Sequence, residues 1–141
     1  MSDKTQFVDN GDGTIQDNRL NIAWSKRDSW QIHQDWLDFD EAMAFIDQLN
    51  RKDYLGFHDW RMPERKEIEN LFLPEVTIKA RSNADIHLPD LFEANCGNGS
   101  WVLPFDQQAA FYFSYSSGLS QHYDKDFSQG YVRPVRLWGD E

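Results

Sequence analysis

The segment Phe7-Val8-Asp9-Asn10-Gly11-Asp12-Gly13-Thr14-Ile15 sets an Asn-Gly pair and an Asp-Gly pair between two short apolar stretches. Glycine adopts at little cost the positive φ that tight hairpin turns require, and Asn or Asp commonly precedes it there. The segment therefore predicts an antiparallel β-hairpin. The apolar residues that follow predict a further strand over residues 20–24.

A helix is expected after this β-structure. Asp38 offers an N-cap, and Glu41 three residues later completes a capping box. The apolar residues beyond Asp38 recur at helical spacing: Phe39, Ala42, Met43, Phe45, Ile46 and Leu49. The pattern predicts a helix over residues 39–51, and residues 25–38 before it are expected to form a packed loop or a short strand.

The second half of the chain completes an α+β pattern. A second helix is expected to begin near Pro63, a residue suited to the first helical turn, and to end before Pro74. A long loop is expected over residues 73–99, held to the core by the apolar residues 88–92. Strands are expected over three ranges, residues 100–103, 109–115 and 130–137. The sequence therefore predicts a single α+β domain over residues 1–141, with a small antiparallel sheet, two helices and a long irregular loop region.

The composition is that of a strongly acidic globular protein. Of the 141 residues, 40% are hydrophobic and 15% are aromatic, which supplies a core and excludes a disordered chain. The formal net charge of −10 repels phosphate backbones at long range, so we expect no nucleic-acid partner. No apolar run approaches the ~20 residues that cross a bilayer, so we expect no membrane insertion.

The single cysteine, Cys96, excludes an internal disulfide, a CxxC redox pair and a multi-cysteine zinc site. The stretch Met1-Ser2-Asp3-Lys4-Thr5-Gln6 lacks the basic and then apolar run of a secretory signal, although a signal already removed would leave no trace. We therefore expect a cytoplasmic location, in a reducing compartment.

Motifs for cofactors and metals are missing from the sequence. Asp9 and Asp12 lack the spacing of a calcium-binding loop, so a hairpin turn is favoured over a calcium site there. The four histidines are scattered and form no zinc motif, and neither a phosphate-binding glycine loop nor a serine nucleophile elbow occurs. We expect no cofactor.

The segment Phe57-His58-Asp59-Trp60-Arg61-Met62-Pro63 allows two interpretations. An enzyme would use Asp59, Arg61 or His58 in a cleft. A structural role would bury Trp60 in the core and use Arg61 or Asp59 to hold the backbone where the second helix begins. We favour the structural role. Arg133 and Arg136, which alternate with valines, are likewise expected to be anchoring groups.

One late segment has the composition of a recognition surface. Between residues 112 and 131 the chain is rich in Tyr, Ser, Asp and Gly, where Tyr gives rigid amphipathic area and Ser and Gly give adaptable hydrogen bonding. The candidate ligand-binding residues are Tyr112, Ser114, Tyr115, Ser117, Gln121, His122, Tyr123, Asp124, Lys125, Asp126 and Ser128. Tyr115, His122, Tyr123 and Asp124 are expected to be the main contacts. The alternative is an ordinary polar loop between two strands.

Taken in order, these motifs resemble the bacterial Lcl C-terminal domain family, named after the terminal domain of a collagen-like adhesin. The resemblance rests on the segment over residues 7–15, on Asp59-Trp60-Arg61-Met62-Pro63 and on Tyr131-Val132-Arg133-Pro134-Val135-Arg136. It covers about residues 7–136. It implies a C-type-lectin-like fold and a non-enzymatic role, because enzymes of that fold group need paired cysteines or an iron site from a partner domain.

The resemblance also implies a function. We expect a module that binds a protein or a carbohydrate ligand through residues 112–129, similar to the variable proteins that retroelements diversify. Secreted members often carry cysteines in the first helix and the closing motif, where this chain has Phe45 and Pro134, which favours an intracellular setting. The negative charge argues against the glycosaminoglycan binding attributed to the adhesin domain. The alternatives are the enzyme described above and a structural subunit of a larger assembly, and the sequence leaves the oligomeric state undecided.

Overall fold

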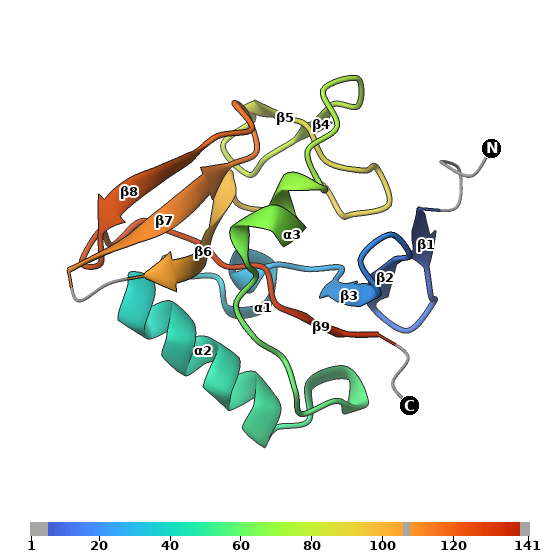
Figure 1. The fold of residues 1–141 in the computed structure, drawn as a ribbon, viewed down its shortest axis with the longest axis horizontal. Helices are drawn as coiled ribbons and strands as arrows, with labels where there is room; N and C mark the ends of the chain where they lie inside the picture. Colours follow the sequence, from blue (N-terminus) through green and yellow to red (C-terminus); the bar gives the residue numbers. More distant parts are fainter. Residues whose placement is uncertain (1–5, 106–107, 139–141) are drawn as a thin grey trace.

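The computed structural model describes residues 6–105 and 108–138. Residues 1–5, where we looked for an export signal, lie outside this part. Within the described residues, two main antiparallel sheets and three α-helices form an α+β fold, as the sequence predicts. Figure 1 shows the strands β6–β8 on one side of the molecule and β1–β3 on the other, with α3 between them.

The first sheet has the strand order β1-β2-β3-β9, and its strands are Phe7–Asp9, Thr14–Asp17, Ile22–Ser25 and Val135–Leu137. The predicted hairpin is confirmed by the antiparallel pairing of β1 with β2. Asp9 Oδ1 accepts a hydrogen bond from the Gly11 amide at 2.9 Å, and Asp12 Oδ1 accepts one from the Thr14 amide at 3.0 Å. These aspartates therefore stabilise the turn, as the hairpin interpretation expects.

The second sheet has the order β6-β7-β8, and its strands are Gly99–Phe105, Ala109–Ser114 and Ser120–Asp124. A small two-stranded sheet, β4 (Ile78–Lys79) with β5 (Asp85–Ile86), lies in the expected long loop. The apolar patch of that loop does reach the core, since Leu88 and Phe92 are both buried.

In the described part of the chain, three α-helices and one short 3₁₀ helix accompany the sheets: α1 (Ser29–His33), α2 (Phe39–Arg51), α3 (Arg65–Glu69) and the 3₁₀ helix η2 (Tyr54–Gly56). The bounds of α2 confirm the prediction. Its capping box is formed, because Asp38 Oδ1 accepts from the Glu41 amide at 2.8 Å and the Asp38 amide donates to Glu41 Oε1 at 2.9 Å. The buried face of α2 packs against the second sheet, where the Phe39 and Trp101 ring centroids lie 5.6 Å apart, edge to face.

Four expectations need correction. Residues 29–33 form the short helix α1 where a loop or strand was expected, because Asp28 and Gln31 make a second capping box. The helix expected from Pro63 starts only at Arg65 and has five residues. The strand expected over residues 130–137 is regular only over Val135–Leu137, and the polar segment after β7 contains the unexpected edge strand β8.

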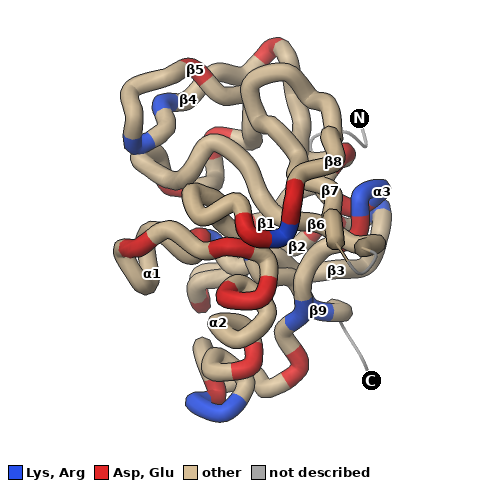
Figure 2. The backbone as a smooth tube through the Cα atoms, turned by 90° about the vertical axis from the view of Figure 1, so that its left-hand side faces the viewer, with Lys and Arg blue, Asp and Glu red and all other residues tan. Residues whose placement is uncertain are grey.

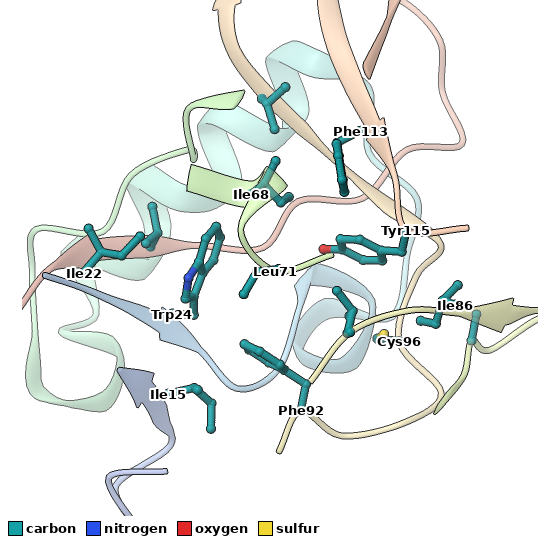
Figure 3. Packing of buried hydrophobic residues seen from close by; sticks show 14 residues of the cluster. Ile15, Ile22, Trp24, Ile68, Leu71, Ile86, Phe92, Cys96, Phe113 and Tyr115 are labelled. Atoms are coloured by element: carbon teal, nitrogen blue, oxygen red, sulfur yellow. The ribbon is translucent and has the colours of Figure 1, made fainter. Parts of the chain in front are cut away.

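Two clusters of buried side chains form the core. The first joins the first sheet to α3 and the long loop, and Figure 3 shows Trp24 facing Ile68 and Leu71, with Tyr115 and Cys96 beyond them. The second lies between α2 and the second sheet and contains Trp60 and Trp101. The second sheet therefore separates the two clusters, so alternate residues of β7 enter different ones.

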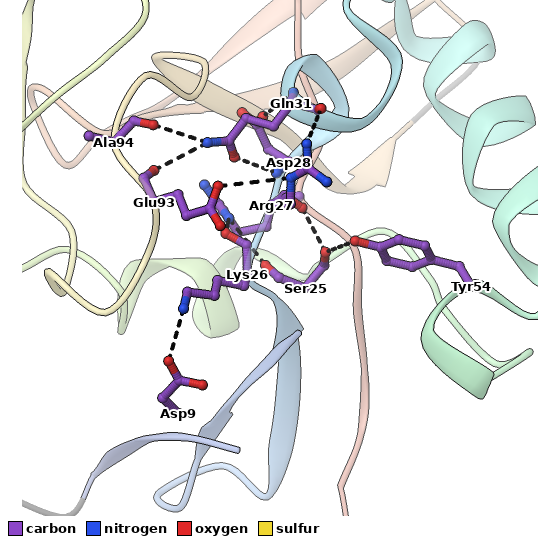
Figure 4. Close-up of polar contacts among 10 residues, drawn as sticks. Asp9, Ser25, Lys26, Arg27, Asp28, Gln31, Tyr54, Glu93 and Ala94 are labelled. Atoms are coloured by element: carbon purple, nitrogen blue, oxygen red, sulfur yellow. Dashed lines mark hydrogen bonds and ion pairs between the residues drawn. The ribbon is translucent and has the colours of Figure 1, made fainter. Parts of the chain in front are cut away.

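Buried polar contacts tie the elements together. Arg133 is fully buried, and its Nη1 donates to the carbonyls of Ser25 at 3.1 Å and Lys26 at 2.9 Å. Asp28 caps α1 and accepts a hydrogen bond from the Gly97 amide at 2.7 Å, and burial raises the pKa of its carboxyl. Figure 4 shows the neighbouring contacts that join Gln31 of α1 to the long loop. The expected anchoring role of Arg133 is confirmed.

Candidate functional site

A hollow of about 250 Å³ opens on the surface beside the second sheet. We call it the aromatic hollow. Eight residues line it: Trp36, Arg81, Asn98, Tyr112, Tyr123, Phe127, Gln129 and Tyr131. Five of these are aromatic, two carry amides and one carries a positive charge. A ligand pocket typically combines apolar walls with a few oriented polar groups, and this lining has both.

The aromatic side of the hollow continues the second core cluster outward. Tyr112 packs edge to face on the fully buried Trp101, with ring centroids 5.3 Å apart. Tyr123 then stacks on Tyr112 with an interplanar angle of 15°, and Phe127 packs edge to face on Tyr123 at 4.8 Å. Rings anchored in this way lose little further freedom when a ligand contacts them, so the surface is preorganised.

Hydrogen bonds fix the polar groups of the same side. The Tyr112 hydroxyl accepts from the Tyr131 amide at 3.2 Å and donates to Asn98 Oδ1 at 3.3 Å. Burial raises the pKa of Tyr112 well above its ordinary value, so this hydroxyl stays protonated. The Asn98 amide nitrogen carries two further donors that can serve a ligand.

On the other side, Arg81 lies against aromatic rings. Its guanidinium carbon is 3.8 Å from the centre of the Trp30 ring and 5.7 Å from that of Trp36. Arg81 Nη1 donates to the Tyr131 hydroxyl at 3.3 Å, and Trp36 Nε1 donates to the same hydroxyl at 3.0 Å. The Tyr131 oxygen thus joins the tryptophan and the arginine, and both are held at the rim.

Two glycines allow these walls to meet. Leu37 and Gly130 exchange backbone hydrogen bonds at 2.9 and 3.2 Å, and a Cβ at Gly130 would come within 2.5 Å of Trp101 Nε1. A Cβ at Gly97 would come within 2.3 Å of the Tyr131 ring. Because Gly130 and Gly97 have no side chains, the chain segments that carry Trp36 and Tyr131 can approach this closely.

Two further hollows adjoin the first. One of about 200 Å³ shares Trp36 and is lined by His33, Asp35 and Glu41 among others. The other shares Tyr123 and Phe127 and adds two carboxylates: Asp124 and Asp126. Figure 2 shows acidic segments along α2 and at the end of β8. The aromatic hollow therefore contains a basic residue but has acidic neighbours on both sides.

The structure divides the residues that we expected to contact a ligand. Tyr112 and Tyr123 line the aromatic hollow. Tyr115 is fully buried in the first core cluster, where its hydroxyl lies 3.4 Å from Arg133 Nε, so the expectation that it contacts a ligand is wrong. Tyr115 follows an alternation in β7 that sends Phe113 and Tyr115 to the opposite side from Tyr112.

The strand alternation of β8 separates the other candidates. Gln121 and Tyr123 share the side of Tyr112, whereas His122 and Asp124 lie on the opposite side, where the His122 ring stacks on Phe111 at 4.2 Å. His122 and Asp124 therefore do not join the aromatic hollow.

The remaining candidates lie in turns. The hydroxyls of Ser114 and Ser117 accept hydrogen bonds from amides of the β7–β8 turn. Lys125 lies 4.5 Å from the centre of the Phe105 ring, and Asp126 and Ser128 are exposed in the segment after β8. Their proposed part in ligand binding stays a prediction.

The candidate residues included neither Phe127 nor Gln129, although both lie in the late segment, and sequence reasoning missed four further residues of the hollow: Trp36, Arg81, Asn98 and Tyr131. They come from four separate segments, and no sequence spacing relates them. The capping pattern of Asp28 and Gln31 could have located α1 and thus the turn that presents Trp36. For Arg81 the sequence offers no such signal, because its position follows from the fold of the long loop.

The segment considered for catalysis has its charges paired. Arg61 donates to both carboxylate oxygens of Glu67, at 2.9 and 2.7 Å, and so ties the segment to α3. Asp59 accepts from Arg136 Nε at 2.6 Å, which lowers the pKa of Asp59. His58 is exposed, with Nδ1 3.5 Å from Asp53. Arg61 therefore has the structural role that we favoured, and Asp59 pairs with Arg136 of the last strand.

Cys96 is buried, and burial raises the pKa of its thiol to about 11, which disfavours the reactive thiolate. Within residues 6–105 and 108–138, no three His, Cys, Asp or Glu side chains converge as metal ligands would. The described helices are all too short or too polar to cross a membrane.

Comparison with known families identifies the family of the chain. Residues 13–136 match the Lcl C-terminal domain, a range that includes every residue of the aromatic hollow. No curated protein matches the chain.

Proposed function

The chain belongs to the Lcl C-terminal domain family, and from this premise we propose that it is a non-catalytic recognition domain that binds its ligand in the aromatic hollow. The observation that carries the proposal is the preorganised lining, in which Trp36, Arg81 and Tyr131 are joined by hydrogen bonds at the rim. Trp, Tyr and Arg are the residues that most often dominate the binding energy of protein interfaces.

The size of the hollow supports a small bound group. Pockets for drug-sized ligands and cofactors have volumes of roughly 300–1,000 Å³, and this hollow has about 250 Å³. It suits one side chain or one sugar ring that projects from a larger partner. The ligand is therefore expected to be a protein or a carbohydrate, with only its projecting group inside the hollow.

The residues of the late segment support a broader contact surface around the hollow. Gln121, Asp126, Ser128 and Gln129 are exposed, so their side chains can change without disturbing the core. We propose a C-type-lectin-like fold for the domain and, as a finer hypothesis, diversification of these positions by a retroelement. Parallel sequencing of this locus from many isolates tests the latter, and uniform variation along the gene would contradict it.

A paired screen tests the function. The wild-type domain is immobilised and probed with a random peptide library and with a glycan array, and each positive ligand is measured again on variants. Trp36→Ala and Tyr123→Ala should weaken binding by about 30-fold or more, the loss typical of a central aromatic contact. Leu119→Ser is the matched control, since Leu119 is 62% exposed and lies outside the hollow.

The outcome is decisive if the variants are folded, which their circular dichroism and urea unfolding establish. Ligands that bind wild type and Leu119→Ser but not the two hollow variants support the proposal. Ligands that bind all four proteins alike refute it, and so does the absence of any ligand in both screens.

A further inference from the structure

The positive charge in the aromatic hollow is unusual in this protein. The formal net charge is −10, yet Arg81 is the one charged residue among the eight that line the hollow. Among the residues that the structure describes, no carboxylate forms an ion pair with Arg81, whereas Arg61 and Arg136 each have one. The charge of Arg81 is therefore not neutralised within the described chain.

The guanidinium of Arg81 is nevertheless held in place. The Arg81 amide donates to the Cys96 carbonyl at 2.7 Å, which fixes the backbone. The guanidinium lies over Trp30 and donates one hydrogen bond to Tyr131. An arginine has five N–H donors in a planar fork, so several remain for a ligand. A fork that is already stacked and oriented loses less entropy when it binds a planar anion.

We infer that the aromatic hollow receives a carboxylate group of a protein partner and that Arg81 is its ion-pair partner. This inference rests on the proposed function and names the chemistry of the group bound. A carboxylate matches the guanidinium fork in two parallel hydrogen bonds. The Asn98 amide and the Gln129 amide can donate to the same group from the hollow lining.

The surroundings favour a single carboxylate on a protein over a polyanionic chain. Asp124 and Asp126 line the hollow next to Tyr123, and Asp35 and Glu41 line the hollow next to Trp36. A chain with a negative charge on every unit would meet these carboxylates on either side. A protein can present one acidic residue flanked by neutral or basic ones, which complements a basic centre with an acidic rim.

Matched small probes test the inference. The first pair is N-acetylglutamate α-amide, which has one carboxylate, and its neutral isostere N-acetylglutamine α-amide. The second pair is glucuronate and glucose. Binding is followed by nuclear magnetic resonance through the indole N–H signal of Trp36, which reports on the hollow because Trp36 Nε1 bonds to Tyr131. The proteins are wild type, Arg81→Gln, Arg81→Lys and Arg51→Gln.

Wild type should bind the glutamate probe roughly tenfold or more tightly than the glutamine probe, because hydrogen bonds between charged groups are the stronger ones. Arg81→Gln should abolish the difference, and Arg81→Lys should keep part of it. Arg51→Gln removes the same charge from an exposed pair on α2 and should leave the difference unchanged.

Several results would overturn the inference: equal affinity for glutamate and glutamine probes, a preference that survives in Arg81→Gln, or no response of Trp36 to any probe. A preference for glucuronate over glucose without a preference for glutamate would also overturn it, since the carboxylate would then belong to a sugar. Each of these leaves the proposed function to be judged by the separate screen with Trp36→Ala.

Discussion

Replacement of Arg133 by methionine should strongly destabilise the protein. Arg133 Nη1 donates to the buried carbonyl of Ser25 and to the partly buried carbonyl of Lys26, and its guanidinium lies 4.7 Å from the centre of the Phe92 ring. Methionine keeps most of the apolar stem but supplies no donor. Each carbonyl left without its partner costs about 1–3 kcal/mol, so the expected loss in the free energy of unfolding is about 3–5 kcal/mol.

The loss should depend on pH because the positive charge of Arg133 lowers the pKa of the buried carboxyl of Asp28 and so opposes the effect of burial. Burial already raises the pKa of Asp28 above the ordinary value of 3.8, and without Arg133 the pKa should rise further. A carboxyl with a raised folded pKa destabilises the folded state increasingly as pH rises above the unfolded pKa. The Arg133→Met variant should therefore lose more stability at pH 7.5 than at pH 4.5.

Urea unfolding followed by tryptophan fluorescence measures the loss at both pH values. Arg51→Met is the matched control, because Arg51 forms an exposed pair with Asp47 on α2 and its removal should cost less than about 0.5 kcal/mol. If the free energies of unfolding of Arg133→Met and Arg51→Met differ by less than about 0.5 kcal/mol and their m-values are equal, the bracing role of Arg133 is wrong.

Three further predictions concern other parts of the fold. Burial raises the pKa of Glu67, but hydrogen bonds from Arg61 outweigh burial, so the pKa is lowered overall. Glu67→Gln should therefore lower the free energy of unfolding by about 1–2 kcal/mol at pH 7. The difference in free energy of unfolding, measured by urea unfolding, should disappear as the pH falls from 4.5 through the lower pKa that Glu67 has in the folded state. A difference that does not change with pH would contradict this prediction. Cys96 should react with a thiol reagent at pH 7.5 at least about 100-fold more slowly in the native protein than in urea, because it is buried with a pKa of about 11, and equal rates would contradict this. Asp38→Ala should cost about 1 kcal/mol by thermal or urea unfolding, since it removes the cap of α2, and an unchanged stability would show that the cap contributes nothing.

The elements that sequence reasoning located are those whose signals are local. The bounds of α2 could be predicted because a capping box and a long amphipathic pattern coincide there. The helix α1 has five residues, too few to show helical periodicity, although its capping box was visible. The strand β8, Ser120-Gln121-His122-Tyr123-Asp124, has hardly any apolar side chains because it lies at the edge of its sheet.

The candidate site was predictable only on one side. The composition of residues 112–129 pointed to Tyr112 and Tyr123, which do line the hollow. It could not separate them from Tyr115, because the side on which a strand residue lies depends on register and on what covers each face of the sheet. The opposite wall, with Trp36 and Arg81, is brought there by tertiary contacts of the long loop and of α1.

Four arginines of this chain illustrate two kinds of partner. Arg61 and Arg136 face carboxylates at 2.7 and 2.6 Å, and the buried Arg133 bonds to backbone carbonyls, so these three hold segments of the fold together. Arg81 is equally well oriented, but by aromatic rings and one hydroxyl, which position a guanidinium without neutralising it. A cation that is positioned but not paired keeps its charge available to a ligand. The same physical preference that makes arginine a brace in the core therefore supports the binding role that we propose for Arg81 at the surface.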